Sequence, residues 1–105
     1  MSLDFAAPSP GGPPVRDVCV VVLGGALAVG VGDPRAQGWV TRVMGRTHAE
    51  DLRLTVYNLA VVGDTTASVL ARCTSEAQDR WATHDERRLV VSVGLEDARA
   101  GISIA

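Results

Sequence analysis

The stretch Val18-Cys19-Val20-Val21-Val22-Leu23-Gly24-Gly25 decides the fold of this chain. An unbroken run of mainly β-branched residues that ends in two glycines is typical of a strand buried on both faces. Two further apolar runs follow, over residues 54–59 and 89–93. Segments with helical periodicity separate the three runs. The sequence therefore predicts an α/β fold with a parallel sheet covered by helices on both sides.

The predicted helices follow from the spacing of apolar residues. Residues 38–48 are predicted to form a helix, because helical spacing puts four apolar residues on one face: Trp39, Val40, Val43 and Met44. Thr65 or Thr66 is expected to cap a second helix, with Ser68 also in a capping role. The apolar stripe of this helix consists of Val69, Leu70, Cys73, Ala77 and Trp81. Residues 84–88 read as a charged turn. Asp97 is a candidate cap for a last helix that begins at Ala98.

Composition narrows the classes of function. The chain has 105 residues, which suits one domain, and a net charge of -2, which gives no electrostatic reason to bind nucleic acid or an anionic membrane. Residues 7–14 hold four prolines and two glycines, so residues 1–16 are predicted to form a flexible tail before a domain over residues 17–105. The sequence shows neither a signal peptide nor an apolar run long enough to cross a bilayer, and we expect a cytoplasmic setting.

The sequence offers no metal or cofactor motif. Cys19 and Cys73 belong to no C-x-x-C pair or Cys/His cluster, and we expect two buried free thiols, with a disulfide between them as the alternative. Gly25 and Gly30 have the spacing of a Walker loop, but its lysine and hydroxyl residue are missing. The G-x-G-x-x-G fingerprint also fails. We therefore expect neither a nucleotide cofactor nor a metal.

The three predicted strand ends together resemble the SGNH hydrolases, also called GDSL esterases and lipases. Residues 20–40 look like the first family block, a strand running into G-D-S, and residues 57–66 look like the second, which centres on a glycine, here Gly63. Residues 91–98 resemble the third block, G-x-N-D, with Glu96 in place of asparagine. The resemblance implies a three-layer, flavodoxin-like sheet of five strands in the order 2-1-3-4-5. This chain supplies the strands 2-1-3, and the C-terminal strands are missing.

The resemblance also implies that catalysis is impaired. Ala26 stands where the family has its nucleophilic serine, Gly25 where it has aspartate, and Glu96 where it has an asparagine that donates to the oxyanion. A carboxylate is only an acceptor, so Glu96 would repel an oxyanion. Gly63 alone keeps the family identity. No D-x-x-H supplies a base: His84 reads as a solvated turn residue and His48 as a charge at a helix end.

Three interpretations of function follow. The first is a catalytically silent SGNH-like protein that serves as a binding or assembly module. The second is part of an ester hydrolase whose C-terminal half, with the D-x-x-H, lies elsewhere. The third is an unrelated flavodoxin-like domain. In the first two, the third strand is an edge, and we expect a homo-oligomer or a complementary C-terminal chain to cover the edge Leu89–Val93. Asp64 and Asp97 are expected to pair with arginines.

Overall fold

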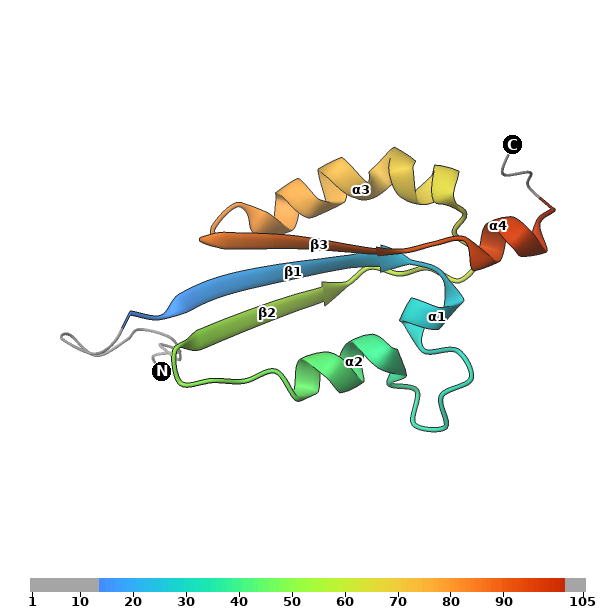
Figure 1. Ribbon diagram of the computed structural model, residues 1–105. Helices are drawn as coiled ribbons and strands as arrows, with labels where there is room; N and C mark the ends of the chain where they lie inside the picture. Colours follow the sequence, from blue (N-terminus) through green and yellow to red (C-terminus); the bar gives the residue numbers. More distant parts are fainter. Residues whose placement is uncertain (1–13, 102–105) are drawn as a thin grey trace, which may run out of the picture.

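The computed structural model describes residues 14–101 and contains one parallel sheet with helices on both faces (Figure 1). The strands are β1 (Arg16–Gly24), β2 (Leu52–Asn58) and β3 (Glu86–Ser92), and their order in the sheet is β2-β1-β3. The helices are α1 (Ala26–Val29), α2 (Gly38–Gly45), α3 (Thr66–Trp81) and α4 (Leu95–Arg99). The predicted α/β class and the strand order 2-1-3 are confirmed.

The central strand β1 carries both halves of the core. Its residues 18–24 are all buried, because β2 and β3 flank it and helices cover its two faces. Successive side chains of a strand point to opposite faces. One set packs with α1 and α2 and consists of Val18, Val20 and Val22. The other packs with α3 and consists of Cys19, Val21 and Leu23.

On the first face, α1 and α2 contribute Ala28 and Val40, which are both fully buried. Asp33 holds the turn between the two helices. Its carboxylate accepts hydrogen bonds from the backbone N–H of Arg35 at 2.9 Å and of Gly38 at 2.8 Å, and it pairs with Arg42 at 2.8 Å. Hydrogen bonds from Arg42, and then from these backbone groups, hold the pKa of Asp33 well below its usual range.

On the second face, Val69 and Ala77 of α3 are buried against β1. Thr65 is the N-cap of α3 and accepts a hydrogen bond from the Ser68 N–H, as predicted. The predicted apolar stripe of this helix is wrong at Leu70, which is 73% exposed. Leu70 lies on the flank of α3 away from Arg72, and Arg72 reaches the end of β2. By helical geometry Leu70 is therefore on the flank nearer β3.

Several other predicted features of the secondary structure are corrected. β3 begins at Glu86, not at Leu89, because Val18 near the start of β1 supplies a partner for Glu86, so much of the predicted charged turn is strand. The apolar run over residues 89–93 is typical of a buried strand, but these residues are exposed or half-buried because β3 lies at an edge of the described sheet. The last helix begins at Leu95 after Gly94, so Asp97 is not its cap. Helix α2 ends at Gly45, and the short helix α1 was not predicted.

The predicted tail falls largely outside the description of the structure. Residues 1–13 and 102–105 lie outside the described residues, and Arg16, the last residue of the predicted tail, already belongs to β1. Its guanidinium donates to the Glu86 carboxylate at 2.8 Å. Between residues 14 and 101, none of the helices has the length and apolar character needed to span a bilayer.

Candidate functional site

The carboxyl ends of the three strands meet at one end of the sheet, as the predicted order requires (Figure 1). Backbone hydrogen bonds tie the segment after β2 to the end of β1: Leu59 N donates to Val22 O at 2.8 Å and Val61 N to Gly24 O at 3.0 Å. The segment after β3 turns into α4 at Gly94, whose φ of +119° favours glycine. All three sequence blocks therefore border one site.

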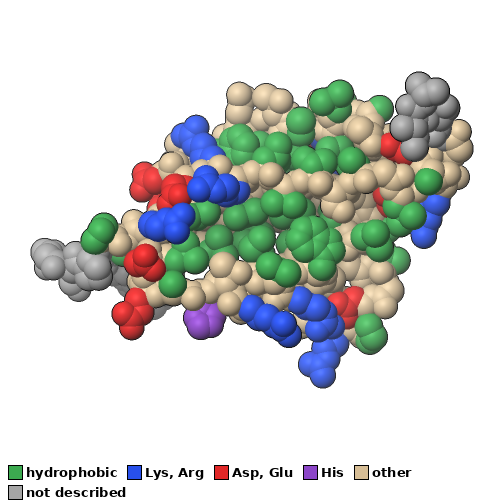
Figure 2. All heavy atoms as spheres, in the orientation of Figure 1, with side chains coloured by type: hydrophobic (Ala, Val, Ile, Leu, Met, Phe, Trp, Pro, Cys, Tyr) green, Lys and Arg blue, Asp and Glu red, His purple; other side chains and the backbone are tan. Residues whose placement is uncertain are grey.

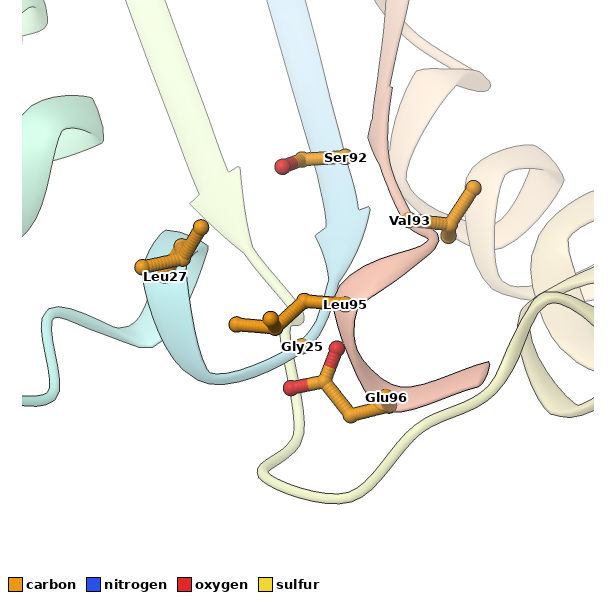
Figure 3. A pocket seen from close by; sticks show the side chains of 6 residues that line it. All are labelled: Gly25, Leu27, Ser92, Val93, Leu95 and Glu96. Atoms are coloured by element: carbon orange, nitrogen blue, oxygen red, sulfur yellow. The ribbon is translucent and has the colours of Figure 1, made fainter. Parts of the chain in front are cut away.

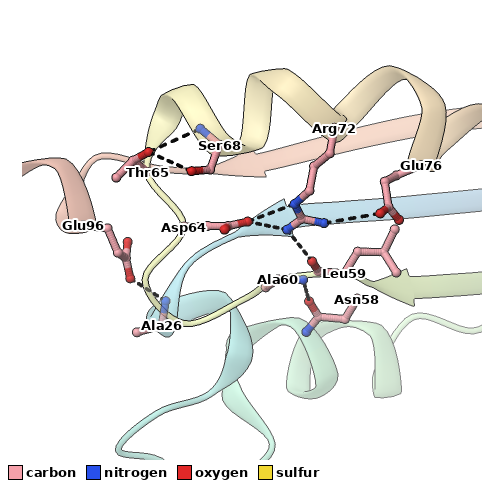
Figure 4. A network of polar contacts seen from close by, with 10 residues as sticks. All are labelled: Ala26, Asn58, Leu59, Ala60, Asp64, Thr65, Ser68, Arg72, Glu76 and Glu96. Atoms are coloured by element: carbon pink, nitrogen blue, oxygen red, sulfur yellow. Dashed lines mark hydrogen bonds and ion pairs between the residues drawn. The ribbon is translucent and has the colours of Figure 1, made fainter.

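The centre of the site is a contact between Glu96 and Ala26. The Ala26 backbone N–H donates to Glu96 Oε1 at 2.7 Å across a sequence separation of 70 residues (Figure 4). Glu96 is the buried charged residue of the described chain, with 7% of its surface exposed. A carboxylate this strongly shielded from water needs such a donor. Glu96 therefore belongs to the fold as well as to the site.

Gly25 makes room for this carboxylate. A Cβ atom placed on Gly25 would overlap the carboxyl group of Glu96. The backbone φ of Gly25 is -111°, which other residues can also adopt. Glycine is therefore required here because there is no space for a side chain, and not because of a left-handed conformation. The two departures from the G-D-S and G-x-N-D patterns thus fit each other physically, because any side chain at residue 25 would displace the carboxylate at residue 96.

Gly63 lies nearby in the segment between β2 and α3. It is exposed, has a φ of +92°, and has open space around the position of a Cβ atom. It lines a pocket of about 290 Å³ together with Val62, Thr65, Glu96, Arg99 and Ala100. The three residues that the family resemblance singles out are thereby brought to one place: Glu96 contacts Ala26 and shares a pocket with Gly63.

The acidic residues beside the site have structural partners. Asp64 pairs with Arg72 at 2.5 Å, as predicted, and Arg72 also donates to Leu59 O at 2.8 Å (Figure 4). The prediction of an arginine partner for Asp97 is wrong. Asp97 instead accepts hydrogen bonds from the hydroxyl and the backbone N–H of Thr66, and these bonds, the hydroxyl first, lower the pKa of Asp97. It caps the start of α3 from a different element.

Neither histidine of the chain reaches the site. His84 Nδ1 lies 2.9 Å from Asp17 Oδ1, near the start of β1 and so at the opposite end of the sheet from Ala26. Its side chain is only 14% exposed, which corrects the prediction of a solvated residue. His48 lies three residues beyond the end of α2, so it is not a helix-end charge. The residues that the structure describes provide no imidazole base at this end of the sheet.

The two thiols are free, as expected, but only one of them is buried. Cys19 is fully buried in β1, and its thiol lies 3.8 Å from Arg80 O. Burial, with a smaller effect of the Asp17 charge, raises the pKa of Cys19. Cys73 is half-buried on α3. Both lie on the α3 face of the sheet, and neither lines the pockets around Glu96.

Comparison with known proteins leaves the family of this chain open. No protein-family model matches the sequence, and no curated protein matches it either. The SGNH resemblance therefore rests on the residues and their placement. Sequence reasoning identified Glu96 as a lost oxyanion donor but missed that it binds the Ala26 amide. The only signal in the sequence was that two positions depart from the family pattern together: Gly25 replaces the aspartate and Glu96 replaces the asparagine.

Proposed function

We propose that this chain is a catalytically silent, SGNH-like α/β module that serves binding or assembly. The observation that carries this proposal is the hydrogen bond from the Ala26 N–H to the buried Glu96 carboxylate. In the family pattern, the amide at the position of Ala26 would hold an oxyanion. In this chain that donor already holds a full negative charge, which would repel a second one at the same place.

The residue types at the site support the same conclusion. The methyl group of Ala26 has no lone pair with which to attack an ester. Glu96 accepts hydrogen bonds where the family has a donor. Losing a single oxyanion donor typically slows acyl transfer by about 10²–10³-fold. With both histidines away from this end of the sheet, the described residues also supply no imidazole as a general base here.

A nitrophenyl ester assay tests this proposal. We expect the purified chain to hydrolyse the ester no faster than buffer does, and Ala26→Ser to remain silent because Glu96 still occupies its amide. The diagnostic variant is Gly63→Pro, which deletes the second family amide. Gly32→Pro is the matched control, since Gly32 has a similar φ of +89° and equally open surroundings in the turn after α1.

The outcome that overturns the proposal is clear. Turnover that survives purification, is lost in Gly63→Pro and persists in Gly32→Pro would show a working hydrolase site. It would favour the alternative in which this chain is one part of an ester hydrolase, with its D-x-x-H supplied elsewhere. Absence of turnover in every variant supports the silent module.

The edge of the sheet supports the assembly part of the proposal. Strand β3 pairs with β1 on one side, and its other side is an edge within the described structure. Three apolar residues here stay exposed: Leu89 at 43% and Val91 at 48% in β3, and Val93 at 38% directly after it. Hydrophobic side chains spread across the middle of this side of the molecule, between α3 and α2 (Figure 2). An exposed apolar edge of this kind is a template for pairing with another strand.

We propose that a second copy of this chain covers the edge. A parallel, in-register pairing of two β3 strands would place Arg87 opposite Arg87 and Arg88 opposite Arg88. Like charges directly opposite each other are unfavourable. An antiparallel pairing centred on Val91 instead places residues 89–93 of the two copies side by side and leaves the arginines outside. Both copies would then bury the apolar half of β3 and keep its charged half in water.

Sedimentation equilibrium at micromolar concentration tests the dimer. We expect the native chain to be dimeric and Val91→Lys to be monomeric, because two lysines would face each other at the centre of the pairing. Val31→Lys is the control, since Val31 is similarly exposed, at 56%, but lies in the turn after α1. A native monomer that melts cooperatively would overturn this part of the proposal.

A further inference from the structure

A second, smaller pocket opens beside Glu96 at the carboxyl ends of β1 and β3 (Figure 3). Its volume is about 110 Å³. Three apolar side chains and two polar groups surround it, and its lining residues are Gly25, Leu27, Ser92, Val93, Leu95 and Glu96. A mainly apolar lining with a few polar groups is typical of small-molecule sites, and a pocket smaller than their usual volume of about 300–1,000 Å³ suits only a small chemical group.

The Glu96 carboxylate has one oxygen left for a ligand. Oε1 accepts the Ala26 N–H at 2.7 Å, whereas Oε2 has no hydrogen bond or ion pair within residues 14–101. In that part of the chain, Trp81 Nε1 is the only fully enclosed side-chain nitrogen or oxygen without a hydrogen-bond partner, so Oε2 is not fully enclosed. Oε2 therefore keeps some exposed surface, and the Glu96 side chain lines this pocket as well as the larger one. A largely desolvated carboxylate with a free oxygen favours a cationic hydrogen-bond donor.

The chain itself does not satisfy this carboxylate. Arg99, three residues further along α4, lines the larger pocket on the Gly63 side and forms no ion pair with Glu96 in the described structure. The sequence contains no lysine. A side-chain ammonium group at this pocket must therefore come from another molecule.

We propose that the pocket beside Glu96 binds a primary alkylammonium group. This inference names a ligand class for the binding module proposed above and rests on that function. A cavity of about 150 Å³ holds benzene, so 110 Å³ suits about four or five non-hydrogen atoms. The ammonium would donate to Glu96 Oε2 and the Ser92 hydroxyl. The alkyl chain would contact Leu27, Val93 and Leu95.

An NMR titration of the ¹⁵N-labelled chain with n-butylammonium chloride tests the proposal. We expect saturable shifts of the Ala26, Ser92 and Leu95 amides, with a dissociation constant on the order of 1 mM for so small a ligand. 1-Butanol, which has the same number of heavy atoms and no charge, is expected to bind at least about tenfold more weakly. Nα-acetyl-lysine amide distinguishes the source of the ammonium group. If it binds as well as butylammonium, a lysine side chain is an acceptable ligand, and if it does not, only small alkylamines are.

The matched variants are Glu96→Gln and Glu50→Gln. The first keeps the shape of the side chain and an acceptor for the Ala26 amide but removes the charge, so we expect at least about tenfold weaker binding. The second removes an exposed carboxylate just before β2, at the other end of the sheet, and is expected to change nothing. Equal binding of butanol, unchanged affinity in Glu96→Gln, or no saturable shift overturns this inference. A chain that binds no butylammonium and hydrolyses no ester loses this inference and keeps the proposed function.

Discussion

Replacing Gly25 with alanine tests whether Glu96 holds its position at the Ala26 amide in solution. A Cβ atom at residue 25 would overlap the carboxyl group of Glu96, so the carboxylate must move away from the amide. Loss of a hydrogen bond to a charged group costs about 1.5–3 kcal/mol, and the overlap itself adds little because the overlapped atoms are the flexible end of the Glu96 side chain. We expect Gly25→Ala to lower the free energy of unfolding by about 2 kcal/mol.

A double-mutant cycle isolates the contact. Glu96→Ala alone is expected to cost about 1–3 kcal/mol, because the Ala26 amide loses its partner. In the Glu96→Ala background the space beside Gly25 is empty and its φ of -111° is accessible to alanine. Gly25→Ala should then change the stability by less than about 0.5 kcal/mol. The resulting coupling energy is about 2 kcal/mol, well above what independent sites show.

Urea unfolding, followed by the fluorescence of Trp39 and Trp81, measures all four free energies. Gly45→Ala is the control, since Gly45 ends α2 with open space around its Cβ position. This control should be stabilising by up to about 1 kcal/mol, because alanine is the better helix former. If Gly25→Ala costs as much without Glu96 as with it, the carboxylate does not occupy the site and the reasoning fails.

Two further predictions concern pH and thiol reactivity. Because Arg42 and backbone N–H groups depress the folded-state pKa of Asp33, its stabilising effect is present above its ordinary pKa of 3.8 and is lost as the pH falls below it. Asp33→Asn should therefore show a smaller loss of melting temperature than the native chain between about pH 5 and pH 2; an equal loss would contradict this role. For the thiols, we expect iodoacetamide to modify half-buried Cys73 well before buried Cys19, whose pKa burial raises. Mass spectrometry of the native chain measures the order of modification, and faster labelling of Cys19 would contradict the described packing.

Much of the fold could be predicted because its signals are local. The β-branched run of β1 and the helical periodicity of α3 each predict a secondary-structure element from neighbouring residues alone. Predictions failed where residues distant in the sequence decide the secondary structure or the burial of a side chain. Glu86 joins β3 because Val18 lies opposite it, and Leu70 is exposed because no element covers that flank of α3 within the described residues.

The site was predictable in its place but not in its chemistry. Strand ends of a parallel sheet meet at one edge, which brought Ala26, Gly63 and Glu96 together as expected. The sequence did not reveal what these residues do to one another. That Asp97 caps α3, and does not cap its own helix, was likewise invisible, because Thr66 lies 31 residues away in sequence.

The sequence alone determined that strands and helices alternate around a central buried β1, because periodicity and β-branching act between near neighbours. It also determined that no serine nucleophile stands at residue 26. Only the tertiary structure decided that Glu96 bonds to the Ala26 amide from 70 residues away and needs the space that Gly25 leaves. That contact depends on β3 lying beside β1, a long-range pairing that no local pattern specifies.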